Sequence, residues 1–183
     1  SLGPDVGQLG KQAFMFEEFL MREGNKGLKL DLKPIPGGKA VVHGHCHQKA
    51  FGTMKSMKKV LGWIPEFEFE IVDASCCGMS GSFGLEAEHY EASVKMGELA
   101  LLPAVRSAPV DAMIVADGFS CRHQIKDGTG RDAVHVAVLL ARALASHLEG
   151  DVLLVEAGLT AAVGVDKRAG AGLAGLLSGV PVD

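Results

Sequence analysis

Four cysteines are the residues of this 183-residue chain best suited to chemistry. They stand at Cys46, at the adjacent positions Cys76 and Cys77, and at Cys121. Four cysteines are too few for a disulfide scaffold in a chain of this length, so we expect reduced thiols. Grouped thiols bind metals or exchange electrons, whereas unrelated cysteines are often simply buried in a core. Their position relative to the strands and helices has to decide between these alternatives.

The pattern of apolar residues predicts three similar units, each made of a short strand, a polar loop and a helix. An amphipathic helix over residues 6–23, with Leu9, Ala13, Phe16 and Leu20 on one face, and a linker over residues 24–38 precede them. A fourth strand is predicted at residues 152–155. The three units are predicted with strands at 39–42, 67–72 and 112–116, loops at 43–47, 73–84 and 117–131, and helices at 48–61, 85–102 and 133–148.

Alternation of strands and helices at this spacing predicts an α/β fold with a doubly wound, mainly parallel sheet. Such sheets carry function in the loops at the carboxyl ends of their strands. Cys46 follows the first strand, Cys76 and Cys77 follow the second, and Cys121 follows the third. All four therefore belong to loops that meet at one edge of the sheet, which favours a shared site over scattered core cysteines.

The motifs around the cysteines favour an iron–sulfur cluster over a single zinc ion. Structural zinc sites usually take closely spaced cysteine pairs, but the only close pair here is adjacent, at Cys76 and Cys77. Clusters are commonly held by four thiolates. Cys46 and Cys121 each stand just before or at the start of an expected helix, where the helix dipole should lower the pKa of the thiol. The glycines of the second loop should let the backbone turn tightly around a bulky group; they are Gly78, Gly81 and Gly84.

Composition excludes several other classes of protein. The net charge is −4 and the isoelectric point is about 6.0, without the basic stripe of a nucleic-acid-binding protein. No apolar run reaches the length of a membrane span, and no secretion signal opens the chain. We expect a cytoplasmic domain, free or peripheral at the inner membrane. The first residues, Ser1 to Pro4, suggest a piece of a longer protein.

Three stretches carry a resemblance to a known family: HGHCHQKA around Cys46, SCCGMSGSFG around Cys76 and Cys77, and DGFSCRHQI around Cys121. They resemble the "CCG" signature of the cysteine-rich domains of heterodisulfide reductase subunits and of the iron–sulfur parts of glycolate, lactate and glycerol-3-phosphate dehydrogenases. The full sequences of these three stretches are similar to the C-terminal end of fused FAD-linked oxidases. The likeness covers about residues 6 to 148.

The resemblance implies an iron–sulfur electron-transfer domain of a flavin-linked 2-hydroxyacid dehydrogenase, of the glycolate, lactate or 2-hydroxyglutarate type. The implied cofactor is a [4Fe–4S] cluster, with FAD on a separate domain or subunit and a ferredoxin-type cluster domain as a further partner. The isolated domain would then be inactive. Family members commonly end in CxxC, but here the positions around Cys121 are Gly118 and Gln124. A four-cysteine site, or one completed by a histidine, therefore fits better than a five-cysteine site.

Other side chains near the cysteines are candidates for catalytic roles. His45 and His47 could move a proton or bind metal, and Arg122 could clamp a substrate carboxylate. Each of these side chains also has an ordinary structural explanation. The histidines could simply hydrogen-bond within their loop, and Arg122 could lie at a solvated helix start. The implied ligands are Cys46, Cys76, Cys77 and Cys121, with Gly78 also at the cofactor.

Two alternative functions stay open at this point. One is a zinc-stabilised module that docks on a flavoprotein, and the other is a thiol–disulfide redox domain using Cys76 and Cys77. The expected organisation is an N-terminal helix and linker at 1–38, the cysteine-rich domain at 39–148, and a C-terminal extension at 149–183.

Overall fold

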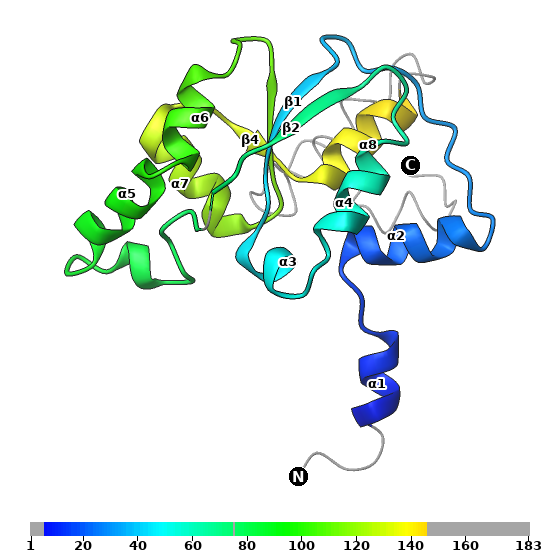
Figure 1. The fold of residues 1–183 in the computed structure, drawn as a ribbon, viewed down its shortest axis with the longest axis horizontal. Helices are drawn as coiled ribbons and strands as arrows, with labels where there is room; N and C mark the ends of the chain where they lie inside the picture. Colours follow the sequence, from blue (N-terminus) through cyan, green and yellow to red (C-terminus); the bar gives the residue numbers. More distant parts are fainter. Residues whose placement is uncertain (1–5, 75, 146–183) are drawn as a thin grey trace, which may run out of the picture.

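Four parallel strands form one sheet in the computed structural model, which describes residues 6–74 and 76–145 (Figure 1). The order in the sheet is β2-β1-β3-β4, and every pairing is parallel. The predicted α/β fold with a parallel sheet is therefore confirmed. The strands are β1 (Lys39–His43), β2 (Glu68–Ile71), β3 (Met113–Ala116) and β4 (Ala133–Val134).

Short helices connect and flank these strands. The strand predicted at 152–155 and the extension predicted at 149–183 lie outside the described residues. The first two residues of the helix predicted at 133–148 form strand β4. The helices are α1 (Val6–Gln12), α2 (Phe16–Asn25), α3 (Cys46–Ala50), α4 (Met54–Leu61), α5 (Tyr90–Glu98), α6 (Leu101–Ser107), α7 (Phe119–Thr129) and α8 (Val136–Ala145), with a 3₁₀ turn η1 (Phe83–Leu85).

The helix predicted over 6–23 is in fact two helices. α2 starts afresh after Met15, whose backbone N–H donates to Glu18 Oε2 at 3.0 Å, as in a capping box. α1 has no buried residue and projects away from the sheet (Figure 1), so Leu9 is 70% exposed. Leu20 on α2 is buried as predicted.

Backbone geometry also divides the other predicted helices. Gly52 adopts a positive φ of 70° between α3 and α4, a conformation that interrupts a helix. The region predicted as helix over 85–102 holds the end of η1, all of α5 and the start of α6. The loop predicted over 117–131 is mostly α7, which begins after Gly118 and ends at Gly130 in the left-handed conformation.

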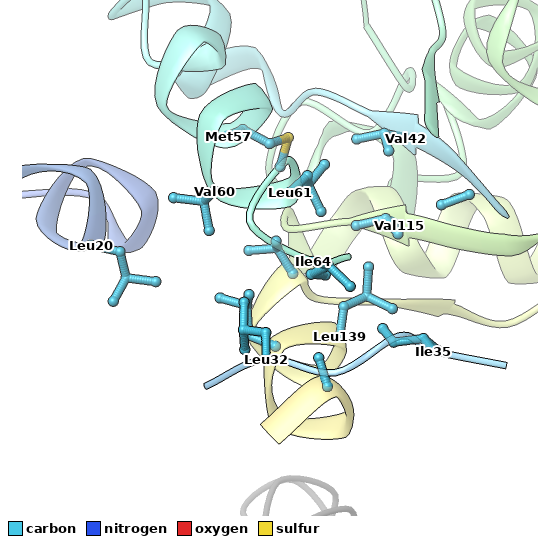
Figure 2. Packing of buried hydrophobic residues seen from close by; sticks show 14 residues of the cluster. Leu20, Leu32, Ile35, Val42, Met57, Val60, Leu61, Ile64, Val115 and Leu139 are labelled. Carbon is cyan, nitrogen blue, oxygen red and sulfur yellow. The ribbon is translucent and has the colours of Figure 1, made fainter. Parts of the chain in front are cut away.

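The sheet is covered on both faces because successive side chains of its central strands point to opposite sides. Val42 and Val115 face α2, α4 and α8, where the core in Figure 2 lies. Val41 and Ile114 face the opposite side, with residues of α6 and α7. The segment predicted as a linker, residues 24–38, contributes Leu32 and Ile35 to the first of these cores, and its first two residues belong to α2.

The strand order places a switch point between β1 and β3. From β1 the chain passes through α4 on one face, and from β3 it passes through α7 on the other. The crevice at the carboxyl ends of two such strands is the usual ligand site of a doubly wound sheet.

Leu61 provides a test of the core. Its side chain is fully buried, so Leu61→Ala should lower the free energy of unfolding by about 2–5 kcal/mol through lost burial and a residual cavity. Urea unfolding followed by circular dichroism measures this change. Val110→Ala is the control, because Val110 is 99% exposed and should change stability by less than about 0.5 kcal/mol. Equal effects of the two substitutions would contradict this packing.

Candidate metal centre

The four cysteines come together at the carboxyl edge of the sheet in two sulfur pairs. Cys46 is the first residue of α3, and its Sγ lies 3.6 Å from Cys76 Sγ. Cys121 lies in the first turn of α7, and its Sγ lies 3.4 Å from Cys77 Sγ. The structure thus brings the cysteines of three separate loops together, as the loop placement had predicted.

The two pairs differ in burial. Cys77 is 2% exposed and Cys121 is fully buried within the core on the α6–α7 face, whereas Cys46 and Cys76 are half-buried. A cavity of about 330 Å³ adjoins Cys46 and Cys77, one cysteine from each pair. The remaining residues that line this cavity are His45, His47, Ser80, Gly81 and Ser120. The sulfurs therefore lie between apolar core on one side and an open pocket on the other.

Gly78 shapes the loop that carries the adjacent cysteines. Its φ is +97°, and a Cβ there would collide with the backbone carbonyl of Ser93. Its N–H donates to Cys76 Sγ at 3.3 Å. The predicted need for glycine at this position follows from both observations, because the backbone has to pass close to α5 and still present an N–H to a sulfur.

The thiols perturb one another's acidity. The pKa of Cys77 is lowered to about 4, mainly because Cys121 Sγ donates to it, with further help from the nearby His43 ring. The pKa of Cys121 is raised by that same hydrogen bond and by burial. Burial and the neighbouring Cys76 thiol raise the pKa of Cys46. The prediction that the pKa values of Cys46 and Cys121 are lowered was therefore wrong, because burial and neighbouring sulfurs raise both of them.

His43 is a buried polar residue beside this group. It is 1% exposed, and neither ring nitrogen has a hydrogen-bond partner in the described part of the chain. One ring nitrogen, Cys77 Sγ and Cys121 Sγ all lie within 4.8 Å of one another. Buried imidazole nitrogens normally have a partner. A metal ion bound to the His43 ring would supply the partner that is missing here.

The three predicted catalytic residues occupy different positions. His45 caps α3, accepting from His47 N–H through Nδ1 at 3.3 Å, and burial lowers its pKa. His47 is exposed and meets the His45 ring edge-on. Arg122 donates to the backbone carbonyls of Ala116 and Asp117 at 3.0 and 2.7 Å, which fixes the end of β3. The structure thus places both histidines at the cysteine pocket and gives Arg122 a structural contact.

A second polar group borders the site and was missed from the sequence. Glu17, Asp117 and His135 lie together, and Gln48 Nε2 donates to Asp117 Oδ2 at 2.6 Å and to Glu17 Oε2 at 3.4 Å. These side chains line a cavity of about 360 Å³ that also reaches His45. Asp117 directly follows β3 and could have been noticed at the sheet edge. Nothing in the sequence indicates that Glu17 belongs to this group, because α2 lies far from Asp117 along the chain.

Another cavity, of about 550 Å³, lies away from the cysteines. Arg131 in its wall donates to the carbonyls of Val105, Ala108 and Ala112, which end α6 and enter β3. Arg106 pairs with Glu98. These arginines neutralise a helix end and an acidic neighbour, which is a structural task.

Comparison with known proteins finds dehydrogenases. The chain is 34% identical over 127 residues to a subunit of the anaerobic glycerol-3-phosphate dehydrogenase of Escherichia coli K12, a match that covers 69% of this chain and 31% of that subunit. It is 40% identical over 65 residues to D-2-hydroxyglutarate dehydrogenase of the same strain, covering 34% of this chain and 6% of that protein. The Pantoea ananatis D-2-hydroxyglutarate dehydrogenase matches at 34% identity over 68 residues, 37% of this chain and 7% of that protein.

The chain spans less than a third of the length of each of these relatives. No family model and no solved structure matches it. The relatives are dehydrogenases or a dehydrogenase subunit, the class of protein that the resemblance of the cysteine motifs had implied. Within the described residues, no helix is long and apolar enough to cross a bilayer.

Glu17 should make stability depend on pH. Burial, and then the neighbouring Asp117 carboxyl, raise the pKa of Glu17 from 4.5 to about 7. The folded chain thus keeps a proton that the unfolded chain loses, and stability falls as pH rises from about 4.5 through about 7. Glu17→Gln should remove this loss, on the order of 1–3 kcal/mol.

Urea unfolding of both proteins between pH 5 and pH 8, without added metal, measures that difference. Glu23→Gln, a half-buried position on the same helix α2 whose carboxylate pairs with Lys26, is the control for loss of a carboxyl group. A constant difference between wild type and Glu17→Gln across this range would show that Glu17 does not hold the proton.

Proposed function

Because this chain is homologous to dehydrogenases and carries CCG-type cysteine motifs, we propose that it is the iron–sulfur electron-transfer domain of a flavin-linked 2-hydroxyacid dehydrogenase. The convergence of four cysteine sulfurs from three loops is the observation that carries this proposal. The [4Fe–4S] ligands would be Cys46, Cys76, Cys77 and Cys121.

The donor set of this edge fits a cluster. Four thiols match the usual ligands of a [4Fe–4S] centre, and a cluster also accepts hydrogen bonds from backbone N–H groups, as Gly78 offers to Cys76. When bound, such a centre exchanges single electrons. The unpartnered, buried ring of His43 beside Cys77 and Cys121 is a further candidate donor to the sulfurs or the metal.

The protein surroundings would give the centre a buried side and an exposed side. The apolar core around Cys77 and Cys121 excludes water there. Cys46 and Cys76 are half-buried, so an electron donor would approach from their side. Burial and hydrogen bonds of this kind set the potential of an iron–sulfur centre.

The same side would dock the flavin-binding domain or subunit. Phe51 after α3, Leu85 in η1 and Phe119 in α7 are 74%, 74% and 59% exposed. All three belong to segments that follow the carboxyl ends of strands. Exposed large apolar side chains are typical of a protein–protein contact. His45, His47 and Arg122 would lie at its rim, with any proton or carboxylate role confined to the assembled enzyme.

A zinc-stabilised module is the second candidate, favoured by the compact group of His43, Cys77 and Cys121. A thiol–disulfide domain is the third. In that case the structure favours the pairs Cys46–Cys76 and Cys77–Cys121, whose sulfurs are close, over the adjacent pair Cys76–Cys77.

Because every candidate needs reduced thiols at rest, we propose a cytoplasmic location, free or peripheral at the inner membrane.

Metal analysis of anaerobically purified protein separates these candidates. About four irons with matching acid-labile sulfide per chain, and a broad visible absorption, would support the cluster. One zinc without sulfide would favour the binding module. Metal-free protein that loses thiols reversibly on mild oxidation would favour disulfide chemistry.

Substitution of single ligands should separate cluster binding from folding. Cys77→Ser and Cys46→Ser should each lower iron content by at least about tenfold, since a hydroxyl is a poor ligand for iron–sulfur iron. The circular dichroism spectrum should be retained, because the core on the α2, α4 and α8 face contains none of the cysteines. Ser82→Ala in the same loop, an exposed residue without a capping hydrogen bond, should retain iron. Unchanged iron in both cysteine variants would refute the ligand assignment.

The chain alone should show no dehydrogenase turnover, because removing hydride from a hydroxyacid requires an acceptor such as flavin. Gly170, Gly172 and Gly175 have the spacing of the glycines in a dinucleotide-binding loop. In a βαβ unit that loop directly follows a strand, whereas the strand predicted at 152–155 ends well before Gly170. The assay uses lactate, glycolate, 2-hydroxyglutarate and glycerol-3-phosphate with a dye acceptor. Activity of the chain without added flavoprotein would place substrate chemistry at the cysteines themselves.

A further inference from the structure

A second set of ligating side chains lies beside the cysteine site and shares none of its cysteines. One ligand atom each from Glu17, Asp117 and His135 lies within 4.8 Å of the others. They come from α2, from the residue after β3 and from the junction of β4 and α8. Three segments far apart in the sequence thus present two carboxylates and an imidazole at one point.

Glu17 carries the strongest sign of a missing partner. The residue is only 2% exposed, and its buried Oε1 has no hydrogen-bond partner among the described residues. Its other oxygen accepts a long hydrogen bond of 3.4 Å from Gln48. Buried carboxylate oxygens are almost always paired, so an unpartnered one at a cavity wall indicates a ligand.

The other two side chains are already held in place. Asp117 Oδ2 accepts from Gln48 Nε2 at 2.6 Å, and Asp117 Oδ1 accepts from Val136 N–H at 2.8 Å. Each oxygen keeps a second lone pair, and such outer hydrogen bonds are what orient metal-binding carboxylates. His135 Nδ1 accepts from Ala137 N–H at 3.1 Å, which orients the ring 3.5 Å from Asp117 Oδ1 and leaves Nε2 as the nitrogen for a metal. Burial lowers the pKa of this imidazole, which favours the neutral form that metals bind.

The charge of the group also favours a cation. Two carboxylates lie together in a buried corner, and the nearby Arg122 donates to backbone carbonyls instead of to either of them. Their repulsion can be relieved by a proton or by a metal ion. The adjoining cavity of about 360 Å³ has room for the water ligands that a metal with only three protein ligands would require.

We propose that Glu17, Asp117 and His135 bind one divalent first-row cation with a preference for oxygen and nitrogen ligands, such as Mn²⁺. Carboxylate and imidazole donors suit this class, whereas the thiols next to them suit softer metals and clusters. The ion would fasten α2 to the carboxyl edge of the sheet. This proposal is independent of the iron–sulfur assignment, because none of its ligands is a cysteine.

Mn²⁺ is the probe, since electron paramagnetic resonance reports free Mn²⁺ directly. The full 183-residue chain should remove one equivalent of Mn²⁺ from solution and should melt at a higher temperature in its presence. Glu17→Gln and His135→Ala should each weaken Mn²⁺ binding by at least about tenfold and abolish the thermal shift. A circular dichroism spectrum like that of wild type shows that each variant is folded.

Two controls make the result specific. Glu23→Gln removes a carboxylate of α2 that pairs with Lys26 and takes no part in the proposed site, so this variant should bind Mn²⁺ like the wild type. The double variant Cys46→Ser, Cys77→Ser should also keep Mn²⁺, which separates this site from the cysteine centre. Absence of stoichiometric Mn²⁺ binding, equal binding by Glu17→Gln, or loss of binding in the cysteine variant would each overturn the proposal; in the first two cases the carboxyl pair holds only a proton.

Discussion

Parallel pairing of β1 with β3 determines which residues can meet at the site. In this register Val42 lies opposite Val115 and His43 opposite Ala116, so the two strands end at the same level. The loops that follow them, leading to Cys46 and Cys121, therefore open at one edge. β2 pairs with the other side of β1 and delivers the adjacent cysteines to the same edge. A slip of one residue would turn His43 from the sulfurs toward the opposite core.

The two faces of the sheet then divide the site into different environments. Cys77 and Cys121 belong to the apolar core on the α6–α7 face, whereas Glu17 reaches the edge from α2, on the other face. Gln48, two residues after Cys46 in α3, donates to the carboxylates of Glu17 and Asp117. It therefore connects the cysteine group with the carboxylate group. Because the buried thiols and the Glu17 carboxylate approach from opposite faces, one edge can present soft and hard donor atoms side by side.

The sequence allowed the cysteine edge to be predicted because it depends on local signals and one topological rule. Apolar runs locate β1, β2 and β3, and parallel strands bring the loops after them together. Helix boundaries were predicted less well, since Gly52 adopts a positive φ and Met15 starts a new capping box. Glu17 could not be predicted, because its role depends on long-range packing of α2. The acidity of the thiols was predicted wrongly for the same reason, as it depends on which sulfurs become neighbours.

Gly118 shows how the missing fifth cysteine follows from the packing. A Cβ at this position would lie 2.7 Å from Cys121 Sγ and would collide with the ring of His45. No side chain, including that of cysteine, fits there while His45 caps α3. Gln124, at the other position around Cys121, is buried and donates to Ser93 O at 3.1 Å. Both positions are thus occupied by structural contacts, so the described cysteine group holds four thiols, with His43 beside Cys77 and Cys121.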